Sequence, residues 1–388
     1  MIEKYYSGVI EQIYNRIGKE TRNIVMANYS NDFSIENLEV IRRYQSNEDN
    51  VFFAYSEFSY NTLVGAYEPF LDIICNMHRR FIGGSFDDFQ KECGVYYLHR
   101  QVLNSYYETG ECFREETVLL NEVAYEQRRM TMAIADMLKK LSEVKPLMIV
   151  INRFQMASKS SIETIKYLID NPCANIGIVL GVNAIVKGTD STVEVWDRIV
   201  ESLEDRSAIY YIGSAGPLKN NVKTTNDDEL YITMNFEQSI QEASNIMEFL
   251  DFEQARRGCR IIEHKLKFED AWIDEKSLRR FYMVYARTSV LLGEMSKAIE
   301  LTNEYKALIP ENDSEHYLSL YYFMKGTCYM YQGKLEKAGN SAKSAYDYAV
   351  LAEDDTLIFK AELLSVMIKM SGWYNIFFCV QDIPVSDE

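Results

Sequence analysis

Residues 1–213 alternate short apolar runs with longer stretches of helical periodicity, and this alternation limits the possible folds more than any other feature. Five runs of strand length are rich in Val, Ile, Phe and Tyr: RNIVMA (22–27), NVFFAY (50–55), PLMIVI (146–151), NIGIVLGV (175–182) and AIYYIG (208–213). Continuous apolar runs of this length are typical of strands buried on both faces of a parallel sheet. We therefore predict a doubly wound α/β domain over residues 1–213, with right-handed crossovers.

Amphipathic stretches separate these runs and predict the helices of the same domain. The predicted helices cover residues 5–20, 34–45, 64–81, 160–171 and 191–205. A longer helix is predicted over 115–143, because Ile134, Leu138 and Leu141 recur at helical spacing. Residues 84–114 show no clear period, so we expect a mixture of helices and loops there.

The second part of the chain has a different pattern. Residues 214–231 are rich in Gly, Pro, Asn, Thr and Asp, which places a linker at 214–235. From residue 236 to 388 every periodic stretch is helical, and strand-like runs are absent from the sequence. The predicted fold class is therefore an α/β domain followed by an all-α domain.

The helical part also repeats itself. Four similar segments begin 43, 40 and 39 residues apart: LDFEQA (250–255), GEMSKA (293–298), GKLEKA (333–338) and GWYNIF (372–377). Each follows an aromatic-rich stretch and is expected to open the second helix of a hairpin. The clearest unit has Gly326, Tyr329, Gly333, Ala338 and Ala345 at the spacing of a tetratricopeptide repeat. We predict a tetratricopeptide-like array over 236–388, with an irregular helical bundle as the alternative.

Composition excludes several classes of partner. The chain has 41 Lys and Arg against 58 Asp and Glu, a net charge of −17, so a nucleic-acid backbone would be repelled. No apolar run reaches the length of about 20 residues that spans a bilayer, so no membrane partner is expected. The seven cysteines are scattered without a C-x-x-C pair, which favours a reduced, cytoplasmic protein. The four histidines show no metal-ligand spacing, so no metal site is predicted.

The order of elements over the first half carries a resemblance to a known family. The sequence VFFAYSEFSYNTLVGAYEPFLDII contains the second strand, a loop and the start of a helix, and PLMIVINRFQMASKSSIETIKYLI contains the third strand and the turn FQMAS (154–158). In these features the chain resembles the nucleotide-binding domain of STAND-class signalling NTPases, relatives of AAA+ proteins, and most closely bacterial regulators in which this domain precedes tetratricopeptide repeats. The resemblance implies a P-loop-NTPase-like sheet domain, with a phosphate loop after the first strand.

The phosphate loop itself departs from the family pattern. A working loop reads G-x-x-x-x-G-K-[ST], where the lysine neutralises the phosphates and the hydroxyl binds Mg²⁺. Aligned by strand and helix, this chain reads Ala27, Asn28, Tyr29, Ser30, Asn31, Asp32, Phe33 and Ser34. Asp32 replaces the second glycine and Phe33 replaces the lysine, so only Ser34 is retained. Loss of one charge-assisted phosphate contact costs about 1.5–3 kcal/mol. We expect a vestigial, closed loop with Phe33 packed inward.

The second motif is altered in the same direction. The family carries acidic residues after the third strand, which hold Mg²⁺ and orient water. Here those positions are Asn152 and Arg153, so a cation stands where a metal ion would bind. We therefore expect no catalytic residue, no bound cofactor and no NTPase activity. The alternative is an ATP/ADP-binding switch with Mg²⁺, in which Ser30, Asn31 and Ser34 contact the phosphates.

These observations predict a non-catalytic signalling or scaffold module, the sensing half of a larger bacterial regulator. Its partner would be a protein or peptide bound by the helical repeats, with homo-oligomerisation as a further option. Candidate groove contacts are Arg279, Arg280, Tyr282, Tyr321, Tyr322 and Tyr329. Helix packing is the other use of these tyrosines. An enzymatic alternative would need a thiol–histidine pair, for which only the spacings Cys93–His99 and Cys259–His264 offer a basis.

Overall fold

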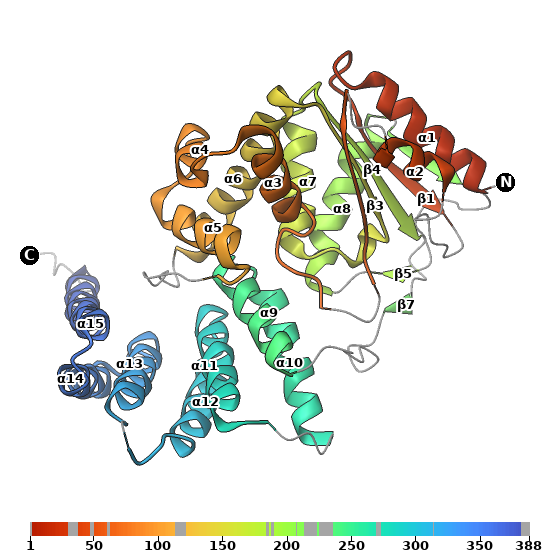
Figure 1. The fold of residues 1–388 in the computed structure, drawn as a ribbon. Coiled ribbons are helices and arrows are strands. Elements are labelled where there is room, and N and C mark those ends of the chain that lie inside the picture. Colours follow the sequence, from red (N-terminus) through yellow and green to blue (C-terminus); the bar gives the residue numbers. More distant parts are fainter. Residues whose placement is uncertain are drawn as a thin grey trace, which may run out of the picture. The chain divides into compact units, whose positions relative to one another are not determined.

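A computed structural model shows the fold (Figure 1). It describes residues 2–29, 38–46, 50–59, 63–112, 122–183, 186–187, 190–206, 208–212, 223–224, 236–268, 273–312 and 314–381. The chain divides into two compact units, residues 1–261 and residues 262–388. Each unit is described by itself below.

The first unit is built on a parallel sheet of five strands, as predicted. The strands are β1 (Ile24–Tyr29), β2 (Phe52–Glu57), β3 (Leu147–Asn152), β4 (Ile176–Asn183) and β6 (Ile209–Ile212). Their order across the sheet is β2-β3-β4-β1-β6, with every pair parallel. All residues of β3 and β4 are buried, which explains their uninterrupted apolar sequence. The short strands β5 (Val186–Lys187) and β7 (Lys223–Thr224) form a separate parallel pair that the sequence did not predict.

Helices cover both faces of this sheet (Figure 1). On one face, α1 (Ile2–Arg16) and α2 (Glu39–Ser46) bury apolar side chains against alternate residues of β1, among them Val25, Ala27 and Tyr29. The opposite face is covered by α6 (Val123–Val144), α7 (Lys159–Asp170) and α8 (Asp190–Glu204). The predicted long helix over 115–143 is seen as α6, and residues 113–121 lie outside the described part.

The path of the chain through the sheet defines a topological switch point. From β1 the chain passes through α2 to the edge strand β2, then steps back through β3 and β4, and passes β1 to reach β6. The helices after β1 and after β4 therefore lie on opposite faces of the sheet, although these strands are neighbours. In open α/β sheets, ligands bind outside the carboxyl ends of the strands at such a point.

Two glycines in β4 allow α1 to approach the sheet closely. A Cβ atom on Gly177 would lie 2.8 Å from Ile17 Cδ1 and 2.9 Å from Ile13 Cγ2. A Cβ atom on Gly181 would lie 2.8 Å from Asn152 Oδ1 and would also collide with the Tyr6 hydroxyl. The absence of side chains at these positions in β4 therefore creates the space into which α1 packs.

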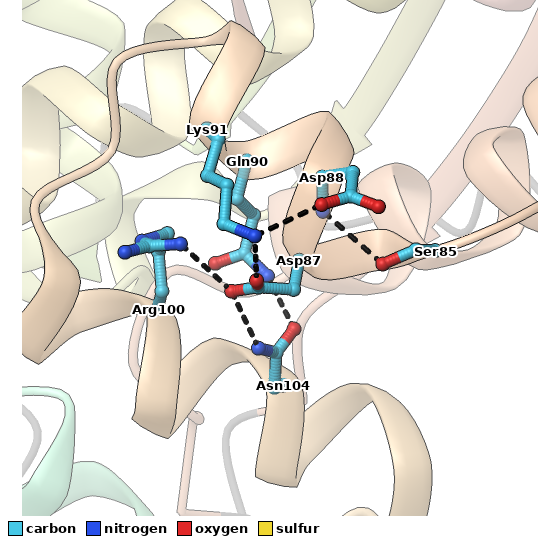
Figure 2. Close-up of polar contacts among 7 residues, drawn as sticks. All are labelled: Ser85, Asp87, Asp88, Gln90, Lys91, Arg100 and Asn104. Atoms are coloured by element: carbon cyan, nitrogen blue, oxygen red, sulfur yellow. Dashed lines mark hydrogen bonds and ion pairs between the residues drawn. The ribbon is translucent and has the colours of Figure 1, made fainter.

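A group of short helices extends this unit beyond the sheet. It contains α3 (Phe70–Met77), a π-helical turn (His78–Ile82), α4 (Phe86–Glu92) and α5 (Tyr97–Thr109). A single helix was predicted over 64–81, but α3 begins only at Phe70. The chain turns just before it, where Tyr67 has a positive φ of 56°. Figure 2 shows how Asp87 of α4 binds α5, through Arg100 at 3.0 Å and Asn104 at 3.1 Å. Lys91 also pairs with Asp87, and it lowers the pKa of that carboxyl group.

The helices α9 (Phe236–Glu248) and α10 (Phe252–Phe268) follow the segment predicted as a linker. The sequence prediction placed both at the start of the repeats, but the first compact unit includes α9 and the part of α10 up to Ile261. Side-chain contacts explain this grouping. Ser160 N donates to Asp251 Oδ2 at 3.1 Å, and Gln254 Nε2 donates to Val64 O at 2.9 Å.

The second unit consists of antiparallel helical hairpins. Its helices are α11 (Glu275–Leu291), α12 (Met295–Ala307), α13 (Glu315–Tyr331), α14 (Leu335–Leu351) and α15 (Asp355–Gln381). The first helices of successive hairpins, α11, α13 and α15, begin at equally spaced positions along the chain. Gly293 and Gly333 have φ values of 78° and 72°, and each ends a helix with a Schellman pattern of backbone hydrogen bonds. The helical second part of the predicted fold is thus confirmed.

The fourth predicted repeat turn is absent. The segment GWYNIF (372–377) was expected to open a new helix, but α15 continues through it to Gln381. Glycine inside a helix costs only about 1 kcal/mol, and the two residues after Gly372 are the aromatic Trp373 and Tyr374. The turns at Gly293 and Gly333 are instead followed by the charged residues Glu294 and Lys334. The turn before α15 is made at Glu353, with a φ of 52°.

Candidate functional site

The carboxyl edge of the sheet contains two pairs of polar side chains in contact. One pair lies next to the switch point, and the other lies between β2 and the end of β3. We call Tyr29, Glu57, Asn152 and Arg153 the carboxyl-edge cluster. Tyr29, the last residue of β1, donates its hydroxyl proton to Asn152 Oδ1 at 2.6 Å. Both residues are fully buried, on the face of the sheet that α1 covers. Their bond lies over Gly181 of β4, whose missing side chain leaves the necessary space.

Arg153 follows β3 at the position that the sequence analysis compared with a metal site, and it is held by β2. Its φ of 55° turns the chain sharply at the end of the strand. Arg153 Nη1 lies 3.0 Å from Glu57 Oε1 and donates to Phe58 O at 3.4 Å. The Tyr55 hydroxyl donates to the other oxygen of Glu57. The positive charge predicted at the metal position is therefore neutralised by a carboxylate of the neighbouring strand.

The turn FQMAS follows directly and is packed into the unit. Phe154–Met156 form a short 3-10 turn, and all three side chains are buried. Gln155 Oε1 accepts a hydrogen bond from Asn183 N at 3.2 Å, which ties this turn to the end of β4. Ser158 then caps α7 by accepting from Ser161 N.

The remaining predicted phosphate-loop residues lie mostly outside the described part of the chain. Ala27 is fully buried in β1 and faces the core on the α1 side. Ser30, Asn31, Asp32, Phe33 and Ser34 are not described, so the expected inward packing of Phe33 stays a prediction.

A cavity of about 350 Å³ opens next to the carboxyl-edge cluster, at the end of β2. Its walls come from the end of β2, the segment 63–68, α3, α5 and α9. We call it the acidic pocket, because Glu68, Asp72 and Glu242 line it together with Tyr106 and the cluster residue Glu57. The Tyr106 hydroxyl donates to Asp72 Oδ1 at 3.1 Å, and Gly65 N donates to Glu68 Oε2 at 2.8 Å.

Two carboxyl groups approach each other closely in the acidic pocket. A Cβ atom on Gly65 would lie 2.9 Å from Glu242 Oε1 and 3.3 Å from Glu68 Oε2, so both oxygens border one small space. Burial raises the pKa of Glu242 to about 7, and the charges of Glu68 and Asp72 add to this effect. Burial likewise raises the pKa of Glu68. Protonation of either group relieves the repulsion between the two carboxylates.

The electrostatics of this edge are unfavourable for phosphate groups. The acidic pocket presents carboxylates, and Arg153 of the adjacent cluster is already paired with Glu57. Among the described residues, no group of three or more His, Cys, Asp and Glu side chains is arranged to hold a metal ion. Within the same described part of the chain, no helix is long and apolar enough to cross a membrane.

The residues of the candidate thiol–histidine pairs, Cys93 with His99 and Cys259 with His264, lie in the following environments. Burial raises the pKa of Cys93 to about 12, so its thiolate is scarce at neutral pH. His99 is fully buried, and its Nε2 lies 3.0 Å from Glu126 Oε2. Cys259 is fully buried in α10.

The six candidate groove residues differ in their exposure. Tyr321 is only 2% exposed, which makes it part of the helix packing in the second unit. Arg279 Nη1 donates to Leu308 O at 2.8 Å, so its guanidinium group joins α11 to the end of α12. Tyr322 stacks on Tyr348 of α14, with 5.6 Å between the ring centroids. Tyr282 and Tyr329 are half-buried, and Arg280 is exposed.

Sequence reasoning missed the acidic pocket completely. Glu68 and Asp72 lie four positions apart, but Tyr106 and Glu242 come from distant segments, and the predicted site included none of the four. Only the tertiary fold brings these side chains together.

Comparisons with known proteins give no family assignment. No family model matches the chain, and neither a curated protein nor a solved structure matches it.

Proposed function

We propose that this protein is a non-catalytic signalling or scaffold module. In this proposal the first unit is a STAND-like nucleotide domain that has lost nucleotide binding and hydrolysis. The second unit is a tetratricopeptide-like array that recognises a protein or peptide, or a further copy of the chain. The module would serve as the sensing half of a larger bacterial regulator in the cytoplasm.

The observation that carries the proposal is the state of the carboxyl-edge cluster. In a phosphate-transferring site, side chains after the third strand must remain available to a metal ion and to water. Here Asn152 accepts a hydrogen bond from Tyr29 inside the core, and Arg153 is paired with Glu57. Breaking either contact would remove a hydrogen bond or ion pair from a buried or half-buried polar group, at a cost of about 1–3 kcal/mol. These contacts support the proposal, because they involve the positions that the resemblance assigns to catalysis.

The acidic pocket supports the same proposal. A nucleoside triphosphate at this edge would approach Glu68, Asp72 and Glu242. Repulsion between its phosphates and these carboxylates would weaken binding. The net charge of −17 adds a repulsive field around the whole chain. The helical hairpins supply extended surface for a macromolecular partner instead.

Nucleotide titration tests the proposal directly. Isothermal titration of the full chain with ATP or ADP and Mg²⁺ is expected to give no saturable heat up to about 1 mM nucleotide. Incubation with ATP is expected to release no phosphate above the rate of a buffer blank. Micromolar binding would overturn the proposal in favour of the ATP/ADP switch.

A variant makes the test more specific. If nucleotide binds, Arg153→Gln would show whether the switch uses this edge, because the substitution removes the charge nearest to the predicted metal position. Lost affinity in Arg153→Gln would place the nucleotide at the switch point. Unchanged affinity would place it elsewhere and would leave the carboxyl-edge cluster without a nucleotide role.

A further inference from the structure

The last helix of the second unit presents an apolar face to solvent. Phe359, Leu363, Val366 and Met370 of α15 are 61%, 41%, 50% and 56% exposed. Their spacing of four, three and four residues places them along one side of the helix. We call these four residues the α15 face. A contiguous row of large apolar side chains on a protein surface is typical of an interaction site.

The other side of α15 is packed into its own unit. Leu364 and Ile368 belong to a core cluster with Met330 of α13 and with Ala338 and Ala342 of α14. The helix is therefore anchored by one side, and the α15 face points away from that core.

The repeat shows what kind of element covers such a face. One repeat step earlier, the positions of the α15 face correspond to Ser319, Phe323, Gly326 and Met330 of α13. Ser319 Oγ donates to Ala345 O of α14 at 2.9 Å. A Cβ on Gly326 would lie 3.3 Å from Ser341 Cβ of α14, and 3.0 Å from Leu364 Cδ2 of α15. The corresponding face of α13 is thus covered by α14, the antiparallel second helix of its hairpin, together with Leu364 and Ile368 of α15.

Residues 355–371 of α15 cannot receive such a covering helix from the residues that follow them directly. The turn that would start it is absent, because α15 continues as one helix from Asp355 to Gln381. The α15 face therefore has the environment of a hairpin's first helix without the antiparallel second helix.

The residue pattern of the α15 face is symmetric about its centre. In an antiparallel pair of α15 helices related by a two-fold axis, Phe359 would lie opposite Met370 and Leu363 opposite Val366. The exposed Glu362 of one copy would lie within about one helical turn of the exposed Lys369 of the other. An isologous interface requires this kind of self-complementarity in both shape and charge.

We propose that a second copy of this chain covers the α15 face, through antiparallel pairing of the two α15 helices in a homodimer. The inference rests on the repeat part of the proposed function and is independent of its nucleotide part. Each copy supplies to the other the antiparallel helix that its own hairpin lacks.

Sedimentation velocity of the full chain over a range of concentrations tests this directly. A concentration-dependent shift from the monomer mass to twice that mass is expected. Val366→Glu places a charge at the centre of the interface, and it is expected to weaken dimerisation at least about 10-fold. A single monomer mass at every concentration would overturn the proposal, whatever else covers the α15 face.

Charge reversal distinguishes antiparallel pairing of α15 from nonspecific association of apolar surfaces. Glu362→Lys and Lys369→Glu are each expected to weaken self-association, because each places like charges opposite each other twice per dimer. The double variant, and an equimolar mixture of the two single variants, are expected to restore it. Lys343→Glu makes the same change at an exposed position of α14 and should leave association unchanged.

Two controls separate the dimer from misfolding of the variants and from the proposed function. Far-UV circular dichroism is expected to show unchanged helicity for all variants. Equal association of all charge variants would contradict the antiparallel arrangement. A monomer that binds no nucleotide would overturn the dimer alone, whereas a dimer that binds ATP would overturn only the nucleotide part of the proposed function.

Discussion

Replacing Glu242 with Gln is expected to stabilise the first unit at pH 8 by about 2 kcal/mol, because the wild-type carboxyl group must ionise in a buried, acidic pocket. In the folded protein this group has a pKa of about 7, above its usual 4.5. Ionising it at pH 8 therefore costs free energy that the unfolded chain does not incur. The full shift corresponds to about 3 kcal/mol, which we reduce because solvent reaches the pocket. Gln keeps a similar shape and removes the charge.

The pH dependence has a defined direction. A carboxyl group with a raised pKa binds more protons in the folded state, so its contribution to stability falls as pH rises from about 4.5 through 7. The groups that face Glu242 are Glu68, Asp72 and Tyr106, with the Glu57–Arg153 ion pair at the rim of the pocket. The wild-type protein should therefore lose stability between pH 5 and pH 8 relative to Glu242→Gln.

Differential scanning calorimetry at pH 5 and pH 8 measures this difference as a shift in Tm. Glu201→Gln, at an exposed position of α8 in the same unit, serves as the control and should change stability by less than about 0.5 kcal/mol at either pH. A Glu242→Gln protein that is less stable than wild type at pH 8 would show that the Glu242 carboxylate is stabilised by a partner rather than penalised by burial.

Substitution of Gly181 with Ala is expected to destabilise the first unit by about 2–3 kcal/mol, because the site has no room for a side chain. The added Cβ would collide with the Tyr6 hydroxyl and would lie 2.8 Å from Asn152 Oδ1. Tyr6 and Asn152 are fully buried, so neither can move toward solvent. Overpacking of this kind typically costs about 1–3 kcal/mol, and displacement of Asn152 would also weaken its bond from Tyr29.

The chain offers a matched control for this change. Gly8 lies in α1, and a Cβ at this position would meet no atom within 4 Å. Gly8→Ala should therefore stabilise the same unit by about 0.5–1 kcal/mol, since alanine is the better helix former. Urea unfolding of both variants measures the two effects, which should have opposite signs. Equal stability of Gly181→Ala and wild type would mean that α1 shifts away from β4 without cost.

Several elements could be predicted from local sequence. The strands β3 and β4 are buried along their whole length and need no alternation of polar residues, so continuous apolar runs predicted them. The partly exposed edge strands β2 and β6 were found because their runs are rich in Phe, Ile and Tyr. The hairpin turns at Gly293 and Gly333 were found because glycine readily adopts the positive φ that ends a helix, and a glycine is visible in the sequence itself. The turns at Leu250 and Glu353 have positive φ without glycine, and the absence of a turn at Gly372 was also unpredictable from the repeat pattern.

The candidate site likewise contains residues that the sequence indicated and residues that only the structure revealed. Asn152 and Arg153 were identified from their position after a predicted strand, but their partners Tyr29 and Glu57 come from other strands. The acidic pocket had no sequence signal, because Glu242 is far along the chain from Glu57, Glu68 and Asp72.

By itself the sequence determined the alternation of strands and helices, the change to an all-helical second part, and the absence of a G-x-x-x-x-G-K-[ST] pattern after the first strand. Those properties depend on the burial and the chemistry of consecutive residues. The tertiary structure alone decided which polar groups satisfy each other at the carboxyl edge, that Glu242 stands against Glu68, and that α15 leaves one face uncovered. Those properties depend on distances between segments, which local periodicity does not encode.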